Sequence, residues 1–387
     1  MSELINAGAK QRDYHWQLLS TVSALALLGN VVVMSGAAAS DDNDARPVVW
    51  VELGGQLERI DGGVERFAPS FIDLVNPSQL VPPTDLERSA RYSNGGEGKI
   101  TFQPEGSVWS FSAAVRYGRT TSKRHLHQEY DFPQHATSHG GSQALYVAPN
   151  GQKYFFLTPN VEDTATSERE SHTIIDFQVG RDVGLGMFGG KTVSTFSFGV
   201  RMVQFSSFAK SKIYLRPDAH FVSSQFAGFI FHNGNYHNYY ASAQMTRNSR
   251  AIGPSIEWNN STPLVGNERE GHVNFDWSAN AAVLFGRHKM AAHHQSSSFY
   301  RYGGIIGTHH TQRVEGLPVD IQRSRSVVTP DVGAVASVSY NVESFKFALG
   351  YRADLFFNAI DGGIDTRKSY NRILHGPFAT INIGLGG

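Results

Sequence analysis

Apolar and polar residues alternate with a period of two along the chain after residue 40, and this pattern is the strongest constraint on the fold. The clearest stretch lies between 271 and 287. Its apolar positions are Val273, Phe275, Trp277, Ala279, Ala281, Val283 and Phe285, and mostly polar or small residues lie between them. A period of two is that of a β-strand whose two faces meet different surroundings. The pattern therefore predicts strands with one apolar and one polar face.

Ten stretches of the chain carry this alternation and are predicted to be strands. They lie near residues 47–60, 97–104, 107–120, 170–181, 193–205, 250–260, 271–287, 328–341, 344–358 and 376–385. The connections between them alternate in length. The longer ones are 61–96, 121–169, 206–249, 288–327 and 359–375, and the shorter ones lie near 105–106, 182–192, 261–270 and 341–344. Outer-membrane barrels have this asymmetry, because their periplasmic turns are short and their extracellular loops are long.

The predicted fold class is all-β: a transmembrane antiparallel up-and-down β-barrel of about ten strands, with eight or twelve strands as the alternatives. Its long loops are expected outside the cell and its short turns in the periplasm. A soluble β-sandwich would also show alternation, but it has no reason to sort its connections by length. Charged residues make up 18% of the chain, below the roughly 25% of soluble domains, which agrees with a lipid-facing surface.

Two features of the composition exclude other classes of protein. The 34 basic residues balance the 34 acidic residues, so nothing marks a surface for nucleic acid. Cysteine is absent from the sequence, which excludes disulfide scaffolds, thiolate zinc sites and cysteine nucleophiles.

The first 39 residues are predicted to be a cleaved signal peptide. Lys10 and Arg12 precede an apolar run over 18–34, and the small residues at 35–39 form a cleavage site before Ser40. An uncleaved anchor helix is the alternative, but the run is shorter than the roughly 20 apolar residues that a span needs. We therefore expect export through the Sec pathway, with residues 40–387 forming the barrel.

Aromatic residues bracket two of the predicted strands. Trp277 and Phe285 lie near the two ends of one apolar face, and Trp109 and Tyr117 bracket another strand in the same way. Eight residues at roughly 3.3 Å each, tilted by about 40°, span about 20 Å of height. These four residues are therefore predicted to belong to the aromatic girdles at the two membrane interfaces.

The opposite faces of the strands are predicted to line the lumen. They carry Glu52, Glu58, Lys99, Arg116, Asp176, Arg201, Glu257, Asp276, Lys346, Arg352 and Asp354. Acids and bases nearly balance in this set, so opposite charges are expected to pair inside the barrel. Eight strands are just filled by side chains and 16–18 leave a channel, so ten are expected to leave at most a constricted path. The lumen is therefore predicted to be a narrow pore or a salt-bridged plug.

Histidines cluster in two of the long connections but do not predict a metal site. One set is His125, His127, His135 and His139, and the other is His293, His294, His309 and His310. No spacing typical of zinc ligands accompanies them. The sequence also has no nucleophile elbow, phosphate-binding loop or dinucleotide fingerprint, so no catalytic residue is predicted.

Two pairs of stretches resemble a known family. The first pair is GPSIEW at 253–258 with FDWSANAAVLFGR at 275–287, and the second is GYRAD at 350–354 with GPFATI at 376–381. They resemble the Legionella-type major outer-membrane proteins and their relatives in Gram-negative bacteria, over about the C-terminal third of the chain. The resemblance implies an outer-membrane β-barrel that forms a pore. Outer-membrane barrels commonly end with an aromatic residue, and Leu385 is expected to take its place here.

The predicted function is that of an outer-membrane barrel acting as a narrow porin-like pore or a structural surface protein of a Gram-negative bacterium. The alternatives are an outer-membrane enzyme, either a protease or a lipid-modifying barrel, and a loop-based adhesin. We expect no enzymatic activity, no cofactor and no nucleic-acid partner. The expected partners are outer-membrane lipids, lipopolysaccharide, the barrel-assembly machinery, and small solutes or ions.

Overall fold

The computed structural model describes most of the chain beyond residue 47. The described ranges are 48–62, 71–72, 80–81, 92–104, 107–130, 145–147, 153–155, 160–183, 193–216, 220–226, 229–267, 270–303, 309–342, 344–363 and 367–385. The predicted signal peptide and the start of the mature chain at Ser40 lie outside these ranges. Within them, no helix is long and apolar enough to cross a membrane.

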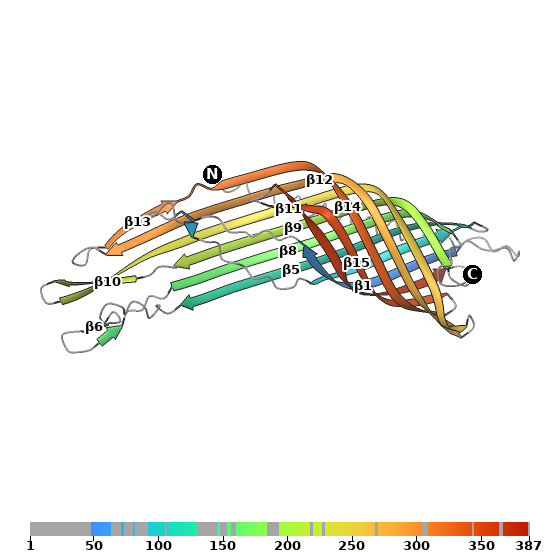
Figure 1. Ribbon diagram of the computed structural model, residues 1–387, viewed down its shortest axis with the longest axis horizontal. Coiled ribbons are helices and arrows are strands. Elements are labelled where there is room, and N and C mark those ends of the chain that lie inside the picture. The colour runs from blue at the N-terminus through green and yellow to red at the C-terminus, as the bar shows by residue number, and fades with distance from the viewer. Residues whose placement is uncertain are drawn as a thin grey trace, which may run out of the picture. The chain divides into compact units, whose positions relative to one another are not determined.

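Ten strands pair antiparallel, each with the next along the chain, to form the barrel (Figure 1). They are β1 (Val48–Gly62), β4 (Tyr92–Gln103), β5 (Trp109–Tyr130), β8 (Asn160–Asp182), β9 (Val193–Arg216), β11 (Phe229–Asn267), β12 (Gly271–Gly303), β14 (Val319–Val342), β15 (Phe345–Asp361) and β16 (Ser369–Leu385). Pairing of β1 with β16 closes the sheet on itself. The predicted ten-stranded antiparallel barrel is therefore confirmed.

Shorter strands extend or decorate this barrel. At one end, β10 (His220–Phe226) pairs with the start of β11, and β13 (His309–Glu315) pairs with the end of β12. Two small hairpins are formed by β2 (Phe71–Ile72) with β3 (Leu80–Val81), and by β6 (Leu145–Val147) with β7 (Lys153–Phe155). All of these lie in the connections that the sequence predicted to be long.

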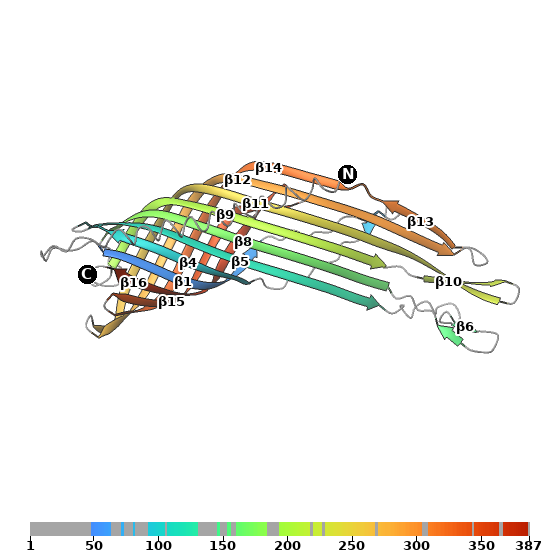
Figure 2. The same cartoon turned by 180° about the vertical axis from the view of Figure 1, so that it is seen from behind.

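Six neighbouring strands are much longer than the other four. β5, β8, β9, β11, β12 and β14 form what we call the tall side, and β4, β1, β16 and β15 form the short side. Figures 1 and 2 show the strands of the tall side running on beyond the ends of β1 and β15. We call this continuation of the six long strands the outer sheet.

The predicted strand bounds are too short at the ends that meet the long connections. β11 begins at Phe229, although its predicted strand begins at 250, and β12 continues to Gly303 instead of ending at 287. The cause is an inversion of polarity along each long strand. On β9 the outward residues are apolar up to Met202, whereas beyond it Val203, Phe205, Ile213 and Leu215 are buried on the inner side. The strands were predicted from an apolar face that points outward, so the prediction ends where this inversion begins.

An apolar band covers the outer surface of the barrel near the short turns. Leu53, Phe198 and Val338 are each more than half exposed, as are neighbours on other strands. Surface apolar patches of this extent are unusual in soluble monomers, and lipid-facing barrel surfaces carry such a band. The band therefore marks the part of each strand that fits a bilayer.

Three of the four residues predicted for the girdles are exposed on this outer surface. Trp109, Tyr117 and Phe285 are exposed, with exposed fractions of 38%, 41% and 56%. Trp277 is mostly buried: its ring packs edge-to-face against Trp258, with the ring centroids 5.2 Å apart, and it also contributes to the lining of the interior cavity.

The facing of β12 can be tested with a charge on each side. Ala281 points outward between Ile256 and Val332, whereas Ser278 points inward and lines the interior cavity. Ala281→Arg places a charge in lipid and should destabilise the barrel by about 2–4 kcal/mol near the midplane. Ser278→Arg should cost clearly less. The measurement is the urea midpoint for unfolding from lipid vesicles. Equal decreases of this midpoint in the two variants would contradict the assigned facing of β12.

Candidate functional site in the barrel interior

A polar cavity lies inside the barrel at the end with the short turns, and we call it the chamber. Its volume is about 320 Å³. Charged residues from eight strands line it: Glu52, Glu97, Lys99, Arg116, Asp176, Arg201, Glu257, Asp276, Lys346, Arg352 and Asp354. All of the predicted lumen residues except Glu58 are therefore found at the chamber wall. They point inward because they alternate along their strands with residues of the apolar band.

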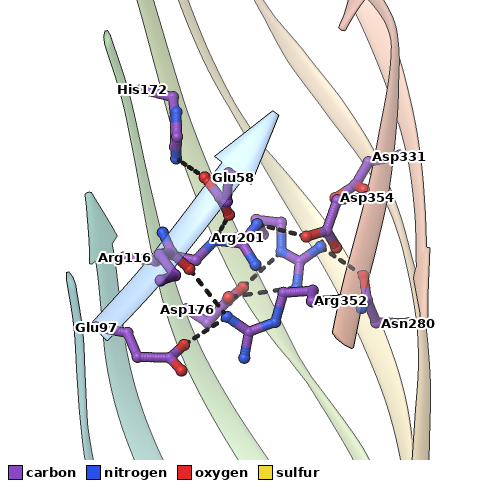
Figure 3. Close-up of polar contacts among 11 residues, drawn as sticks. Glu58, Glu97, Arg116, His172, Asp176, Arg201, Asn280, Asp331, Arg352 and Asp354 are labelled. Atoms are coloured by element: carbon purple, nitrogen blue, oxygen red, sulfur yellow. Dashed lines mark hydrogen bonds and ion pairs between the residues drawn. The ribbon is translucent and has the colours of Figure 1, made fainter. Parts of the chain in front are cut away.

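Arg201 on β9 is the centre of the first ion-pair network in the chamber (Figure 3). Its guanidinium donates to Asp176 on the neighbouring strand at 2.7 Å and to Asp331 across the barrel at 2.5 Å. It also donates to the Asn280 amide oxygen at 2.7 Å. Arg201 and Asp331 are almost fully buried. A buried guanidinium with two carboxylates and an amide holds four strands together, because each partner would otherwise lose its solvation without compensation.

A second network joins Arg116 to two buried acids. The Arg116 guanidinium is 2.6 Å from Asp354 and 3.8 Å from Glu58. The other oxygen of Glu58 is 2.9 Å from Nε2 of His172, so Glu58 lies between a base and an imidazole (Figure 3). Gly118 leaves room for this ring, since a Cβ there would lie 2.4 Å from Cε1 of His172. Glu58 therefore belongs to the interior network beside the chamber.

Two more ion pairs lie in the chamber. Arg352 donates to Glu97 at 2.5 Å, and its guanidinium lies over the Phe378 ring, 4.8 Å from the centroid. Lys346 is 2.7 Å from Asp276 near the short turns, and the Lys346 side chain is more exposed than any side chain of the deeper pairs. The chamber charges thus largely neutralise one another. This arrangement is typical of a structural plug or a weakly ion-selective vestibule.

A cluster of apolar side chains lies in the barrel interior at the outer end of the chamber, and we call it the septum. It consists of Ile60, Ile174, Val203, Phe205, Ala251, Ala282, Leu284, Phe356, Ala359 and Leu374. These ten residues come from seven strands and are exposed by no more than 9% each. The rings of Phe205 and Phe356 meet edge-to-face with centroids 5.2 Å apart. Two inward polar residues lie at the same level: Asp331 is the cross-strand partner of Ala282 and Phe356, and His172 is the partner of Phe205.

A further polar layer lies beyond the septum, outside the membrane-facing part of the strands. Asp361 accepts hydrogen bonds from Arg323 and from the Gly363 N–H, and Arg325 lies 3.5 Å away. Burial alone would raise the pKa of the Asp361 carboxyl, but these hydrogen bonds and charges lower it below its ordinary value. Nearby, Arg372 donates to Glu170 at 2.5 Å, with both side chains buried.

The sequence analysis missed several members of these networks. Glu97 lies two positions before Lys99 on the same inward face, and Asp331 shares its face of β14 with Ser337 and Ser339. That shared face is a signal that could have identified both acids. The partnership of His172 with Glu58 has no such signal, because it depends on how the strands pack across the barrel.

Most of the histidines assigned to loops lie on strands. His125 and His127 are on β5, His293 and His294 on β12, and His309 and His310 on β13. The other two, His135 and His139, lie outside the described residues. His125 is 2.5 Å from Asp163, and His293 is 2.8 Å from Asp320. Among the residues that the structure describes, no three potential ligands are grouped so as to hold a metal ion.

Comparisons with known proteins give structural likeness only. No family model and no curated protein matches the sequence. A deltaS2 mutant of the TodX monoaromatic hydrocarbon channel has a TM-score of 0.22 and 9% identity, covering 89% of this chain and 91% of that one. The Pseudomonas putida toluene transporter TodX has a TM-score of 0.17 and 10% identity, covering 89% of this chain and 90% of that one. OpdK of Pseudomonas aeruginosa, solved with vanillate, has a TM-score of 0.14 and 8% identity, covering 88% of this chain and 99% of that one. At these TM-scores the likeness carries no argument about function.

The Arg201 network can be tested by removing its base. Arg201→Met leaves Asp176 and Asp331 without their shared partner and should destabilise the barrel by about 3–5 kcal/mol. The double variant R201M/D331N should recover part of this loss, because one of the orphaned charges is removed. The exposed Arg181→Met serves as the control for loss of an arginine. Urea midpoints in lipid vesicles give the comparison, and a loss no larger than that of the control would contradict the structural role.

His288 predicts a pH dependence of stability. Its buried ring lies just beyond the membrane-facing part of β12, facing Arg325 and Asp361. Burial and then the charge of Arg325 lower its pKa from 6.5 to about 4. The unfolded chain therefore takes up this proton at a higher pH than the folded barrel does. The contribution of neutral His288 to the free energy of unfolding is fully present above pH 6.5 and is lost as the pH drops toward 4.

The test compares the wild type with His288→Gln. The urea midpoint of the wild type should fall more between pH 7.5 and pH 4.5 than that of the variant, because other groups titrate equally in both. Parallel pH profiles would show that the His288 proton does not contribute.

Proposed function

We propose that the protein is an outer-membrane β-barrel of a Gram-negative bacterium, porin-like in architecture, whose lumen is closed at rest. In this proposal it acts as a structural surface protein: the barrel anchors the chain in the bilayer, and the tall side carries the outer sheet outside the cell. It has no enzymatic activity and needs no cofactor. Its assembly in the membrane depends on the barrel-assembly machinery.

The septum is the observation that carries this proposal. Ten apolar side chains from seven strands meet in the barrel interior, and Leu284, Phe356 and Ala359 are completely buried. An ion that crosses at this level loses most of its hydration against these apolar side chains, which is costly. Hydrophobic constrictions of this kind close channels by excluding water.

The outer surface supports the membrane location. The apolar band runs around the barrel on both the short and the tall side, with Leu53, Phe198 and Leu349 among its exposed members. The predicted resemblance to Legionella-type major outer-membrane proteins agrees with this location. Cell fractionation with a gel that compares boiled and unboiled samples tests it. A soluble periplasmic protein without a mobility shift would overturn it.

A narrow porin-like pore is the second candidate, and the chamber favours it. The chamber wall presents six carboxylates and five bases, as expected for a wetted vestibule. Because these charges nearly cancel, such a pore would be weakly ion-selective. It would conduct only when the septum moves aside.

Conductance in planar bilayers separates the two candidates. The wild type should give few or no openings, because the septum is intact. The double variant L284A/F356A removes two fully buried side chains and should give clear openings. Each substitution should cost about 2–5 kcal/mol of stability, so the heat-dependent mobility shift must first confirm that the barrel is folded.

The matched control is F285A/L349A. It removes the same two residue types from the outer surface, where both are more than half exposed, and should leave conductance unchanged. Steady openings of the wild type would reject the closed lumen in favour of the pore. Openings in both double variants would mean that the septum is not the barrier.

A further inference from the structure

The outward face of the tall side carries a group of cations just beyond the apolar band, and we call it the cation face. It comprises Arg119, Lys123, Arg169, Lys210, Lys212, Arg250, Arg287 and Lys289, from five neighbouring strands. All eight side chains are exposed. None of them forms an ion pair with a residue that the structure describes. Three carboxylates on the same surface have partners of their own: Asp163 and Asp320 are each bonded to a histidine, and Glu315 pairs with Arg313.

Two of these cations lie directly opposite each other at the edge of the apolar band. Arg250 on β11 is the cross-strand partner of Arg287 on β12. Ile252 and Phe285 are exposed residues at the outer edge of the apolar band. Arg250 lies two positions beyond Ile252, and Arg287 lies two positions beyond Phe285, in the direction of the long connections. Lys289 adds a third charge two positions farther out. Like charges directly opposite each other on a sheet repel, so this pair is unfavourable unless an anion lies between them.

The other cations continue the same surface outward. Arg169 on β8 faces Thr121 and is diagonal to Arg119 and Lys123 on β5. Lys210 and Lys212 lie farther out on β9. The outward positions between the cations are largely neutral hydrogen-bonding residues: Thr173, Gln204, Ser206, Asn248, Ser324 and Ser326. The surface thus combines point charges for phosphate with side chains that can bond hydroxyl groups.

We propose that the cation face binds a phosphorylated glycolipid of the outer leaflet, with Arg250, Arg287 and Lys289 holding a phosphate at the membrane edge. The inference rests on the proposed location in an outer membrane. Guanidinium groups bind phosphate in a bidentate manner, so two arginines on adjacent strands form a site that one phosphate can bridge.

The height of the cation face favours a glycolipid over a phospholipid. Lys212 is level with Ser242, which lies ten positions beyond Ile252 along β11. At roughly 3.3 Å per residue and a tilt of about 45°, this is about 23 Å above the band. The headgroup layer of a phospholipid adds only roughly 5–8 Å on each side of a bilayer. Cations above that layer can meet only an anionic headgroup that reaches farther out, such as one built on phosphorylated sugars.

An open groove at the outer end of the cation face suits such a headgroup. Its volume is about 580 Å³, and Lys212, Tyr214 and Tyr240 contribute to its lining. The two carboxylates in the lining, Asp163 and Glu315, are paired with His125 and Arg313. The two tyrosine rings are 4.8 Å apart and tilted by 30°. Aromatic rings with hydroxyl tips offer an apolar surface and a polar contact together, as the two kinds of surface on a sugar ring require.

The test measures binding to the folded full-length barrel in non-ionic detergent. Lipopolysaccharide is added, and the midpoint temperature of the folded-to-unfolded mobility shift gives the apparent affinity. Each surface cation strengthens the affinity for an anionic lipid about fivefold, so R250Q/R287Q should bind lipopolysaccharide about 30-fold more weakly than the wild type. Without lipid this variant should be no less stable than the wild type, because the repulsion between the two arginines is gone.

The matched control is R59Q/R181Q, which removes two arginines that lie outside the cation face and should keep the wild-type affinity. Phosphatidylglycerol vesicles and inorganic phosphate are the comparison ligands, and both should protect less than lipopolysaccharide. Equal affinities of the two double variants would overturn the site. Equal protection by phosphatidylglycerol or by inorganic phosphate would overturn the glycolipid. A wild type that fails to enter lipid vesicles would instead reject the proposed membrane location.

Discussion

Closure of the sheet is the constraint on which the rest of the structure depends. A backbone N–H or C=O group that faces lipid finds no water, so every strand in a bilayer must be paired on both edges. The register of β1 against β16, with Val49 opposite Leu385, removes the last open edge. Closure also gives every strand one face toward lipid and one toward the interior. Each charge on the inner face must then find its partner inside.

The ion pairs and the septum are two answers to the same problem of filling that interior. Near the short turns, the inner residues are charged and neutralise one another through Arg201, Arg116 and Arg352. Farther along the same strands, the inner residues become apolar and pack across the barrel around Phe356 and Leu284. The strands thus change from the pattern of a membrane barrel to that of a soluble sheet without a break in pairing.

This change explains what the sequence could and could not predict. The alternation of apolar and polar residues was enough to locate all ten strands. It also predicted that residues such as Asp176 and Lys346 point inward. It did not predict the outer sheet, where the apolar side chains point inward. Nor could it predict which charges pair. Arg201 meets Asp176 on the adjacent strand, 25 positions away, but its contact with Asp331 spans 130 positions and depends on the curvature of the closed sheet.

The length of β11 has a mechanical consequence. Its 39 residues form one continuous strand, of which those from Phe229 to Ala251 lie beyond the apolar band. At roughly 3.3 Å per residue this outer part is about 76 Å long. It acts as a lever with its pivot at the membrane edge, so a 5° change of strand tilt would move its far end by roughly 7 Å. Because tilt is one way in which a span adjusts to bilayer thickness, the outer sheet would convert a small change of strand tilt into a large displacement of its far end.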